Sequence, residues 1–179
     1  GYLNAAAGVL RIGALTRQKQ GAARIGGGVT LGTSTGTNLF IGTVDGAATA
    51  TLLSGGGGAA DTTTVSIIPF LTADDTFVTY TDAYGLRRLN TATEYYDGLA
   101  TAGANDNVRL TNSVTLAADT TVSALLIPNY SLTVSGAYTL KLASGALLIS
   151  QNTKSQAVSC SRLDCNGREA FIRVHNTGG

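Results

Sequence analysis

Five carboxylates in the middle of the chain are the residues best suited to catalysis: Asp74, Asp75, Asp82, Glu94 and Asp97. A glycoside hydrolase needs two carboxyl groups roughly 5–10 Å apart across the sugar, one of them with a raised pKa. The two adjacent aspartates would face opposite sides of a strand, and on a loop such residues commonly cap a turn. We therefore predict no catalytic residue and keep a glycan-cleaving β-helix enzyme as an alternative.

Most of the tyrosines lie near these carboxylates. Their amphipathic rings suit both sugars and protein interfaces, because one end is apolar and the other is polar. The same rings can instead pack this segment against the rest of the protein. The residues predicted to form a contact or glycan-binding surface are Tyr80, Tyr84, Tyr95 and Tyr96.

The remaining reactive side chains are few. Cys160 and Cys165 can form a disulfide in an oxidising setting, and closing so small a loop contributes about 2 kcal/mol. Reduced, they would be small buried apolar residues. We favour the disulfide. The single histidine, His175, alternates with Arg173 and is expected on the outward face of a strand. Two cysteines and one histidine make no metal site of known spacing, so we predict no metal and no cofactor.

The composition limits the function classes further. The chain has 179 residues, a formal net charge of +1 and only 13% charged residues, so it lacks the basic patch of a nucleic-acid-binding protein. Hydrophobic residues reach 44%, too many for a disordered chain. No apolar run approaches the ~18 residues of a membrane span. We expect no nucleic-acid partner and no membrane insertion.

Strand signals dominate, and they are strongest in residues 108–150. Short runs place apolar residues two positions apart, and turn-forming pairs such as Ser135-Gly136 separate the runs. Leu116 and Leu140 lie 24 positions apart, and Leu126 and Leu148 lie 22 apart. Three short strands per such period are typical of stacked, three-sided coils. The sequence predicts an all-β, right-handed parallel β-helix (β-solenoid) with a loop or small side lobe; an antiparallel β-sandwich or jelly roll is the alternative.

This pattern divides the chain into three segments. Residues 1–63 form a glycine-rich β segment, with strands expected at 9–12, 23–25, 29–31, 38–41 and 50–53. Residues 64–107 form a tyrosine- and carboxylate-rich excursion or side lobe, with strands at 65–70 and 77–80 and a short helix that Thr93 would cap. Residues 108–179 form regular solenoid coils, which we expect to continue beyond the chain.

The order of these runs resembles a known family of repeats. The resemblance covers residues 67–179 and includes Ile67-Ile68-Pro69-Phe70, Asn107-Val108-Arg109-Leu110 and the stretch from Leu163 to Asn176. It is to the autotransporter-associated β-strand repeat proteins, the long β-helical chains of bacterial surfaces and bacteriophage particles. The resemblance implies a fibrous or decorating structural protein without a catalytic site.

The open ends of a coil carry a functional expectation. A stacked coil leaves strand edges and core exposed at each end, so each end needs a cap, a continuation or a partner. We expect a non-catalytic structural protein of an extracellular assembly, foremost a bacteriophage virion component such as a capsid decoration or fibre. A bacterial cell-surface adhesin passenger is the alternative. The expected partners are other proteins or copies of the chain in a homo-oligomer, with surface glycan as a further ligand.

Overall fold

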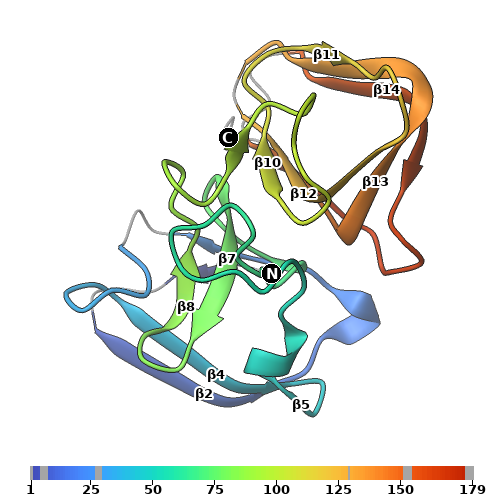
Figure 1. Ribbon diagram of the computed structural model, residues 1–179. Coiled ribbons are helices and arrows are strands. Elements are labelled where there is room, and N and C mark those ends of the chain that lie inside the picture. Colours follow the sequence, from blue (N-terminus) through green and yellow to red (C-terminus); the bar gives the residue numbers. More distant parts are fainter. Residues whose placement is uncertain (1, 5–7, 27–29, 129, 151–154, 176–179) are drawn as a thin grey trace. The chain divides into compact units, whose positions relative to one another are not determined.

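The computed structural model describes residues 2–4, 8–26, 30–128, 130–150 and 155–175 (Figure 1). Within these ranges the regular elements are strands and two short 3₁₀ turns, η1 (Gln18–Gln20) and η2 (Thr49–Leu52), with no α-helix. The described residues contain no helix that is long and apolar enough to cross a membrane. The all-β prediction is confirmed.

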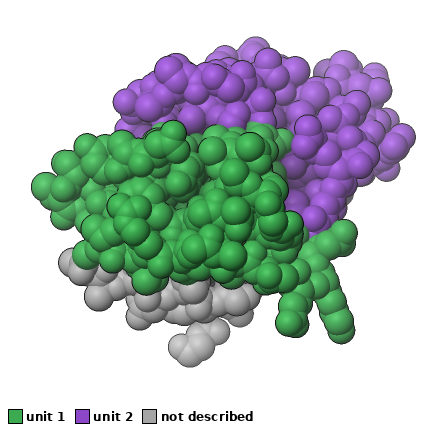
Figure 2. All heavy atoms as spheres, turned by 90° about the horizontal axis from the view of Figure 1, so that it is seen from below, with its two compact units in different colours: residues 1–54, 67–89 green, residues 55–66, 90–179 purple. Residues whose placement is uncertain are grey.

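The chain forms two compact units, coloured separately in Figure 2. Unit 1 contains residues 1–54 and 67–89, and unit 2 contains residues 55–66 and 90–179. The segment 64–107, expected as one excursion, is therefore shared between the two: its residues 67–89 belong to unit 1 and the rest to unit 2.

Unit 1 holds one curled sheet with the strand order β1-β3-β6-β7-β8-β4-β2, with β5 beside β4. Its parallel pairs join β1 to β3, β3 to β6, β2 to β4 and β4 to β8, while β4–β5, β6–β7 and β7–β8 are antiparallel. The strands are β1 (Tyr2–Asn4), β2 (Val9–Leu15), β3 (Ala23–Gly26), β4 (Asn38–Val44), β5 (Ala47–Ala48), β6 (Leu71–Ala73), β7 (Thr76–Thr81) and β8 (Gly85–Arg88).

Unit 2 holds a second curled sheet in which every described pairing is parallel. The strand β13 is its centre, because β11, β12, β14 and β15 all pair with it, and β10 and β9 extend the sheet beyond β12. The strands are β9 (Tyr96–Asp97), β10 (Asn107–Arg109), β11 (Val114–Thr115), β12 (Thr120–Ile127), β13 (Thr133–Ser150), β14 (Ala157–Asp164) and β15 (Phe171–His175).

The ladder registers of unit 2 align apolar side chains in columns. One column, here called the Tyr96 column, joins Tyr96, Val108, Leu125, Leu147 and Ile172. Its members are separated by 12, 17, 22 and 25 positions along the chain. Val108, Leu125 and Leu147 belong to the buried core of this unit, and Tyr96 packs against it. In-register apolar stacking therefore builds the core of unit 2.

Glycines let the long strand β13 bend. Gly136 has φ +120° and Gly145 has φ +77°, values that L-residues with side chains rarely adopt. At Gly136 a side chain would also meet the backbone of Leu116, directly after the neighbouring strand β11. Both glycines lie within β13 near places where its ladder registers shift, with β14 after Gly136 and with β12 between Leu142 and Ala146.

One predicted spacing is confirmed and the other is wrong. Leu126 and Leu148 are direct partners in the parallel β12–β13 ladder, 22 positions apart as expected. Leu116 does not pair with Leu140. Leu140 pairs instead with Thr120, and Leu116 follows Thr115, the partner of Ser135, so that its own neighbour is Gly136. Paired residues in this part of unit 2 are therefore 20 positions apart rather than 24.

Strands were predicted correctly at 9–12, 23–25, 38–41 and 77–80, but four other segments differ. Residues 50–53 lie in and beside the 3₁₀ turn η2. Residues 65–70 form isolated bridges through Val65 and Ile67 and then a turn. Thr93 caps no helix, because residues 91–95 form turns that lead directly into β9. Of the strand expected at 29–31, residue 29 lies outside the described residues and Leu31 forms an isolated bridge with Thr37.

Candidate functional site

Strand β15 of unit 2 leaves part of its apolar face exposed. In the Tyr96 column, Leu125 and Leu147 are 0% and 3% exposed, whereas Ile172 at the end of the column is 54% exposed. Val174, the partner of Ile149, is also 54% exposed. These two side chains lie in line with the core residues of β13, but in the described chain no further strand pairs with β15 to cover them.

Strand β14 contributes to the same surface. Val158, Cys160 and Leu163 on β14 are partly buried and pack against the core, in register with Val134, Gly136 and Leu140 of β13. We call the surface formed by Val158, Cys160, Leu163, Ile172 and Val174 the terminal face. In the described residues β14 and β15 pair only with β13, so their outer backbone edges lack a strand partner.

Unit 1 has a second unpaired apolar edge. Strand β2 ends the sheet order and pairs only with β4 in the described chain. Its residues Val9 and Leu10 are 62% and 44% exposed. Arg11 lies over the ring of Phe40 on β4, 4.1 Å from its centroid. An edge strand of seven residues with exposed apolar side chains is a ready template for pairing with another chain.

A polar cleft of about 220 Å³ lies where β9 and β10 end. One wall is the segment from Asp97 to Thr101, and the other runs from Thr111 to Val114. The carboxylate of Asp97 receives two hydrogen bonds from Arg109, Nε to Oδ1 at 2.8 Å and an Nη to Oδ2 at 2.9 Å. Ala100 and Val114, which are not buried, contribute apolar surface.

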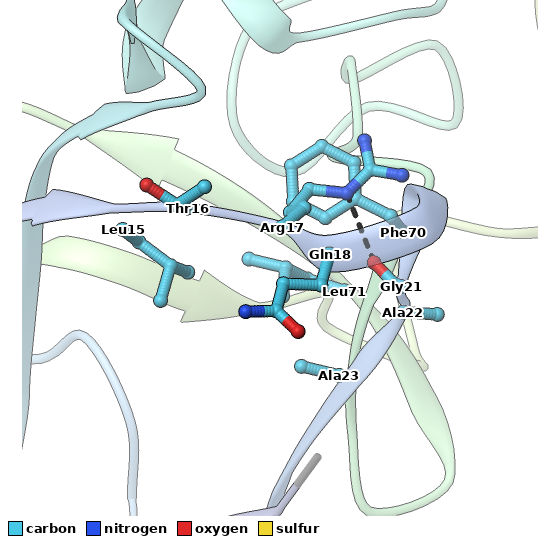
Figure 3. Close-up of a pocket in the computed structure, with 9 residues that line it drawn as sticks. All are labelled: Leu15, Thr16, Arg17, Gln18, Gly21, Ala22, Ala23, Phe70 and Leu71. Atoms are coloured by element: carbon cyan, nitrogen blue, oxygen red, sulfur yellow. Dashed lines mark hydrogen bonds between the residues drawn. The ribbon is translucent and has the colours of Figure 1, made fainter.

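A larger cleft of about 340 Å³ lies in unit 1 beside the turn η1 (Figure 3). Its lining is mostly apolar. The guanidinium of Arg17 stacks on the ring of Phe70, 4.2 Å from the centroid, and its Nε donates to the carbonyl of Gly21. Lys19 and Gln20 in the adjoining turn have φ +51° and +57°. The lining residues are Leu15, Thr16, Arg17, Gln18, Gly21, Ala22, Ala23, Phe70 and Leu71.

The carboxylates considered for catalysis are mostly bound within the protein. Asp74 and Asp75 form ion pairs with Arg88, and Asp74 also pairs with Arg24. Glu94 is fully buried and accepts hydrogen bonds from the backbone amides of Asp61 and Asn90, at 2.9 and 2.7 Å. Asp97 is bound to Arg109, and Asp82 is exposed in the β7–β8 turn. Asp74, Asp75 and Asp82 belong to unit 1, and Glu94 and Asp97 to unit 2.

The four tyrosines do not share one environment. Tyr80 and Tyr84 belong to unit 1, where Tyr84 is 38% exposed, and Tyr95 and Tyr96 belong to unit 2. Tyr95 is buried, and the hydroxyl of Tyr96 lies 3.0 Å from that of Thr101 at the polar cleft.

Both cysteines are free thiols in the structure and are half-buried. The thiol of Cys160 donates to the carbonyl of Arg162 at 3.3 Å. Burial, and then the negative charge of Asp164, raises the pKa of the Cys165 thiol above its ordinary value. The disulfide between Cys160 and Cys165 stays a prediction for oxidising conditions.

The expectation for His175 is wrong. The residue is only 6% exposed, although it lies on the face of β15 opposite to the exposed Ile172 and Val174, as the pattern indicated. The reason is that the other side of these strands is also buried: Ala146 and Leu148 of β13 are 0% exposed. In β15 the exposed residues are Ile172 and Val174, which continue the core-facing columns of β13. Alternation alone therefore does not predict which face of this strand is buried.

Sequence reasoning missed the polar cleft. In the sequence, Thr111, Asn112 and Ser113 are only turn-forming residue types, and Asp97 is only one of five candidate acids. No local sequence pattern could have found it, because the parallel register of β9 and β10 is what places the segments after Asp97 and Arg109 side by side.

The described residues contain no group of three or more His, Cys, Asp or Glu side chains that could hold a metal ion. Comparison with known protein families, with curated proteins and with solved structures finds no match to this chain.

Proposed function

We propose that the chain is a non-catalytic structural protein of an extracellular assembly, in which copies join through their unpaired strand edges. The observation that carries this proposal is the Tyr96 column, whose buried aliphatic side chains end in the exposed Ile172. Exposed apolar surface beside an unpaired strand edge is favourable to bury, since a partner would supply both apolar contacts and backbone hydrogen bonds.

We further propose that residues 90–179 form a short β-solenoid. The support comes from the all-parallel pairing of unit 2 and from separations of 17 to 25 positions between partners from β10 onward. Parallel strands in one sheet are joined by right-handed crossovers in about 98% of cases, which favours the right-handed form.

The occupant of the terminal face in this proposal is a second copy of the chain. Each copy offers an edge at β2 and another at β14 and β15, and each of these strands pairs in parallel with its inner neighbour. A contact between different edges of two copies is heterologous, and repeating it builds a ring or a filament. This geometry suits a fibre or a surface layer.

A bacteriophage virion is the setting we propose, with a bacterial cell-surface passenger as the alternative. Both rest on the resemblance to β-strand repeat proteins, and the low content of charged residues suits a durable outer surface. The neighbouring genes separate the two settings: capsid or tail genes favour the virion, and a downstream outer-membrane barrel favours the passenger.

Sedimentation velocity over a range of protein concentrations tests the assembly. We expect concentration-dependent association of the wild-type chain and its loss in the double variant Ile172→Lys and Val174→Lys, because a lysine ammonium is costly to bury. Tyr138→Lys is the matched control, since Tyr138 is an exposed apolar residue of the same unit outside the terminal face. A wild-type chain that stays monomeric at every concentration would overturn the proposal.

A further inference from the structure

The polar cleft of unit 2 has the size and the chemistry of a site for one small polar molecule. Its volume of about 220 Å³ is below the ~300–1,000 Å³ of pockets that enclose drug-sized ligands, so a single ring fits better than a chain. It is lined by Asp97 of β9 and by the segments that follow β9 and β10. It therefore lies near the Tyr96 end of the Tyr96 column, whereas the terminal face lies at the Ile172 end.

Asp97 is held in a fixed orientation with acceptor capacity to spare. An ionised carboxylate has about four lone-pair positions on its two oxygens. The bonds from Arg109 reach both oxygens but do not use all of these positions, so acceptor capacity is left for a ligand. Because the side chain of Asp97 is 54% exposed, two neighbouring hydroxyl groups of a ligand can reach both oxygens.

The opposite wall supplies further hydrogen-bonding groups. The side chains of Thr111 and Asn112 are exposed and make no hydrogen bond with the described residues. Ser113 Oγ accepts a hydrogen bond from the backbone amide of Thr133 at 3.0 Å, which positions the oxygen while its own proton can still be donated. The cleft therefore offers both donors and acceptors beside the apolar side chains of Ala100 and Val114.

The charges and the lining select a class of ligand. Among the described residues Asp97 is the one charged residue that lines the cleft, and its charge is neutralised by Arg109, so neither an anion nor a cation is favoured. No aromatic ring lines it either, which removes the stacking surface that a nucleic-acid base would need. What remains is a neutral molecule with several hydroxyl groups and an apolar face.

We propose that this cleft binds one neutral sugar ring of a surface glycan, with Asp97 accepting hydrogen bonds from two vicinal hydroxyl groups and Asn112 bonding a third polar group. A single ring offers few atoms, so the dissociation constant of one site is expected near 1 mM. In an assembly of many copies such sites act together and bind a glycan-covered surface much more tightly.

Saturation-transfer NMR with methyl α-glucoside, methyl α-mannoside and methyl α-galactoside tests the site. We expect transfer to at least one of these glycosides and none to its 2,3-dideoxy analogue, which lacks the vicinal hydroxyl groups. Asp97→Asn should weaken binding about tenfold, because a hydrogen bond to a charged group is lost. Asn112→Ala should weaken it about threefold to tenfold without affecting folding, since this exposed side chain has no partner among the described residues.

Asp82→Asn is the control, because it removes an exposed carboxylate in the other unit and should leave binding unchanged. The inference is overturned if none of the three glycosides gives a signal, if the dideoxy analogue gives an equal one, or if neither Asp97→Asn nor Asn112→Ala reduces it. Binding at this cleft does not depend on association of the chain, so the result is independent of the sedimentation experiment.

Discussion

Leu147 and Ile172 are direct partners in the parallel β13–β15 ladder, yet Leu147 is 3% exposed and Ile172 is 54% exposed. Two similar aliphatic side chains therefore occupy paired positions on β13 and β15, and only Leu147 is covered. Comparing the two residues therefore shows how much stability a further strand or a second copy would add by covering Ile172.

Truncation of these two residues should have different effects on the isolated chain. We expect Leu147→Ala to lower the free energy of unfolding by about 2–5 kcal/mol, because it removes buried methyl groups and leaves a cavity. Ile172→Ala should cost about 1 kcal/mol or less at low protein concentration, since half of its side chain is already in water. Urea denaturation of dilute protein measures both values.

Raising the protein concentration should increase only the cost of Ile172→Ala. If copies cover the terminal face, association stabilises the wild-type chain by mass action, and the variant loses part of that stabilisation. The cost of Leu147→Ala should stay constant. Equal costs for both variants at low concentration would contradict the exposed position of Ile172.

Two glycines in left-handed conformations provide a second comparison. Gly145 has φ +77°, and an added Cβ would clash with the backbone oxygen of Glu169. Gly167 has φ +67° and open space around it. We expect Gly167→Ala to cost about 1–2 kcal/mol from backbone strain alone, and Gly145→Ala about 1–3 kcal/mol more from the clash. Thermal unfolding of the two variants tests this order, and a reversed order would contradict the close approach at Gly145.

The buried carboxylate of Glu94 should matter for stability rather than for catalysis. It accepts backbone hydrogen bonds from Asp61 and Asn90, two segments 29 positions apart, and so joins them. Glu94→Gln keeps the size of the side chain but turns an amide group toward a backbone N–H. We expect a loss of about 1–3 kcal/mol in unfolding free energy, against about 0.5 kcal/mol or less for the exposed Asp82→Asn. Similar losses in the two variants would refute this role.

The thiol of Cys165 should react slowly with alkylating reagents. Burial and the charge of Asp164 raise its pKa, so at any pH near neutrality a smaller fraction is thiolate than in an ordinary cysteine. The alkylation rate should rise with pH into the alkaline range, and Asp164→Asn should increase it. Mass spectrometry after iodoacetamide treatment gives the rate at each cysteine under reducing conditions.

The same labelling experiment tests the predicted disulfide. After incubation in an oxidising buffer, protection of both Cys160 and Cys165 that is reversed by a reductant would demonstrate the bond. Labelling of both residues after oxidation would show that they stay reduced.

The sequence predicted unit 2 better than unit 1, and the reason is physical. The partners Leu126 and Leu148 could be matched because strand alternation and a regular period depend on side chains that the sequence names directly. Leu116 and Leu140 could not, because the separation of paired residues varies even within one ladder, from 20 at Thr120 to 22 at Leu126. Alternation determines which face a residue takes but does not count corner residues.

The missed features depend on contacts between distant segments. The helix expected at Thr93 is replaced by turns, and there Glu94 accepts backbone hydrogen bonds from Asn90 and from the distant Asp61. The polar cleft needs the register of Tyr96 with Val108, which no local pattern reveals. His175 is buried because it pairs with Ser150, which is itself only 4% exposed, whereas alternation describes strands with that face in water.

The lengthening of successive turns in the Tyr96 column, from 12 to 25 residues, has a practical consequence for engineering. Strand pairing is kept while the connections grow, and each doubling of a loop costs only about 0.6 kcal/mol in closure entropy. A guest peptide placed at the exposed Asn166-Gly167 turn, where nothing lies within 4 Å of a Cβ built on Gly167, would thus be displayed at small energetic cost. One residue added inside β13 would instead reverse the facing of every side chain after it.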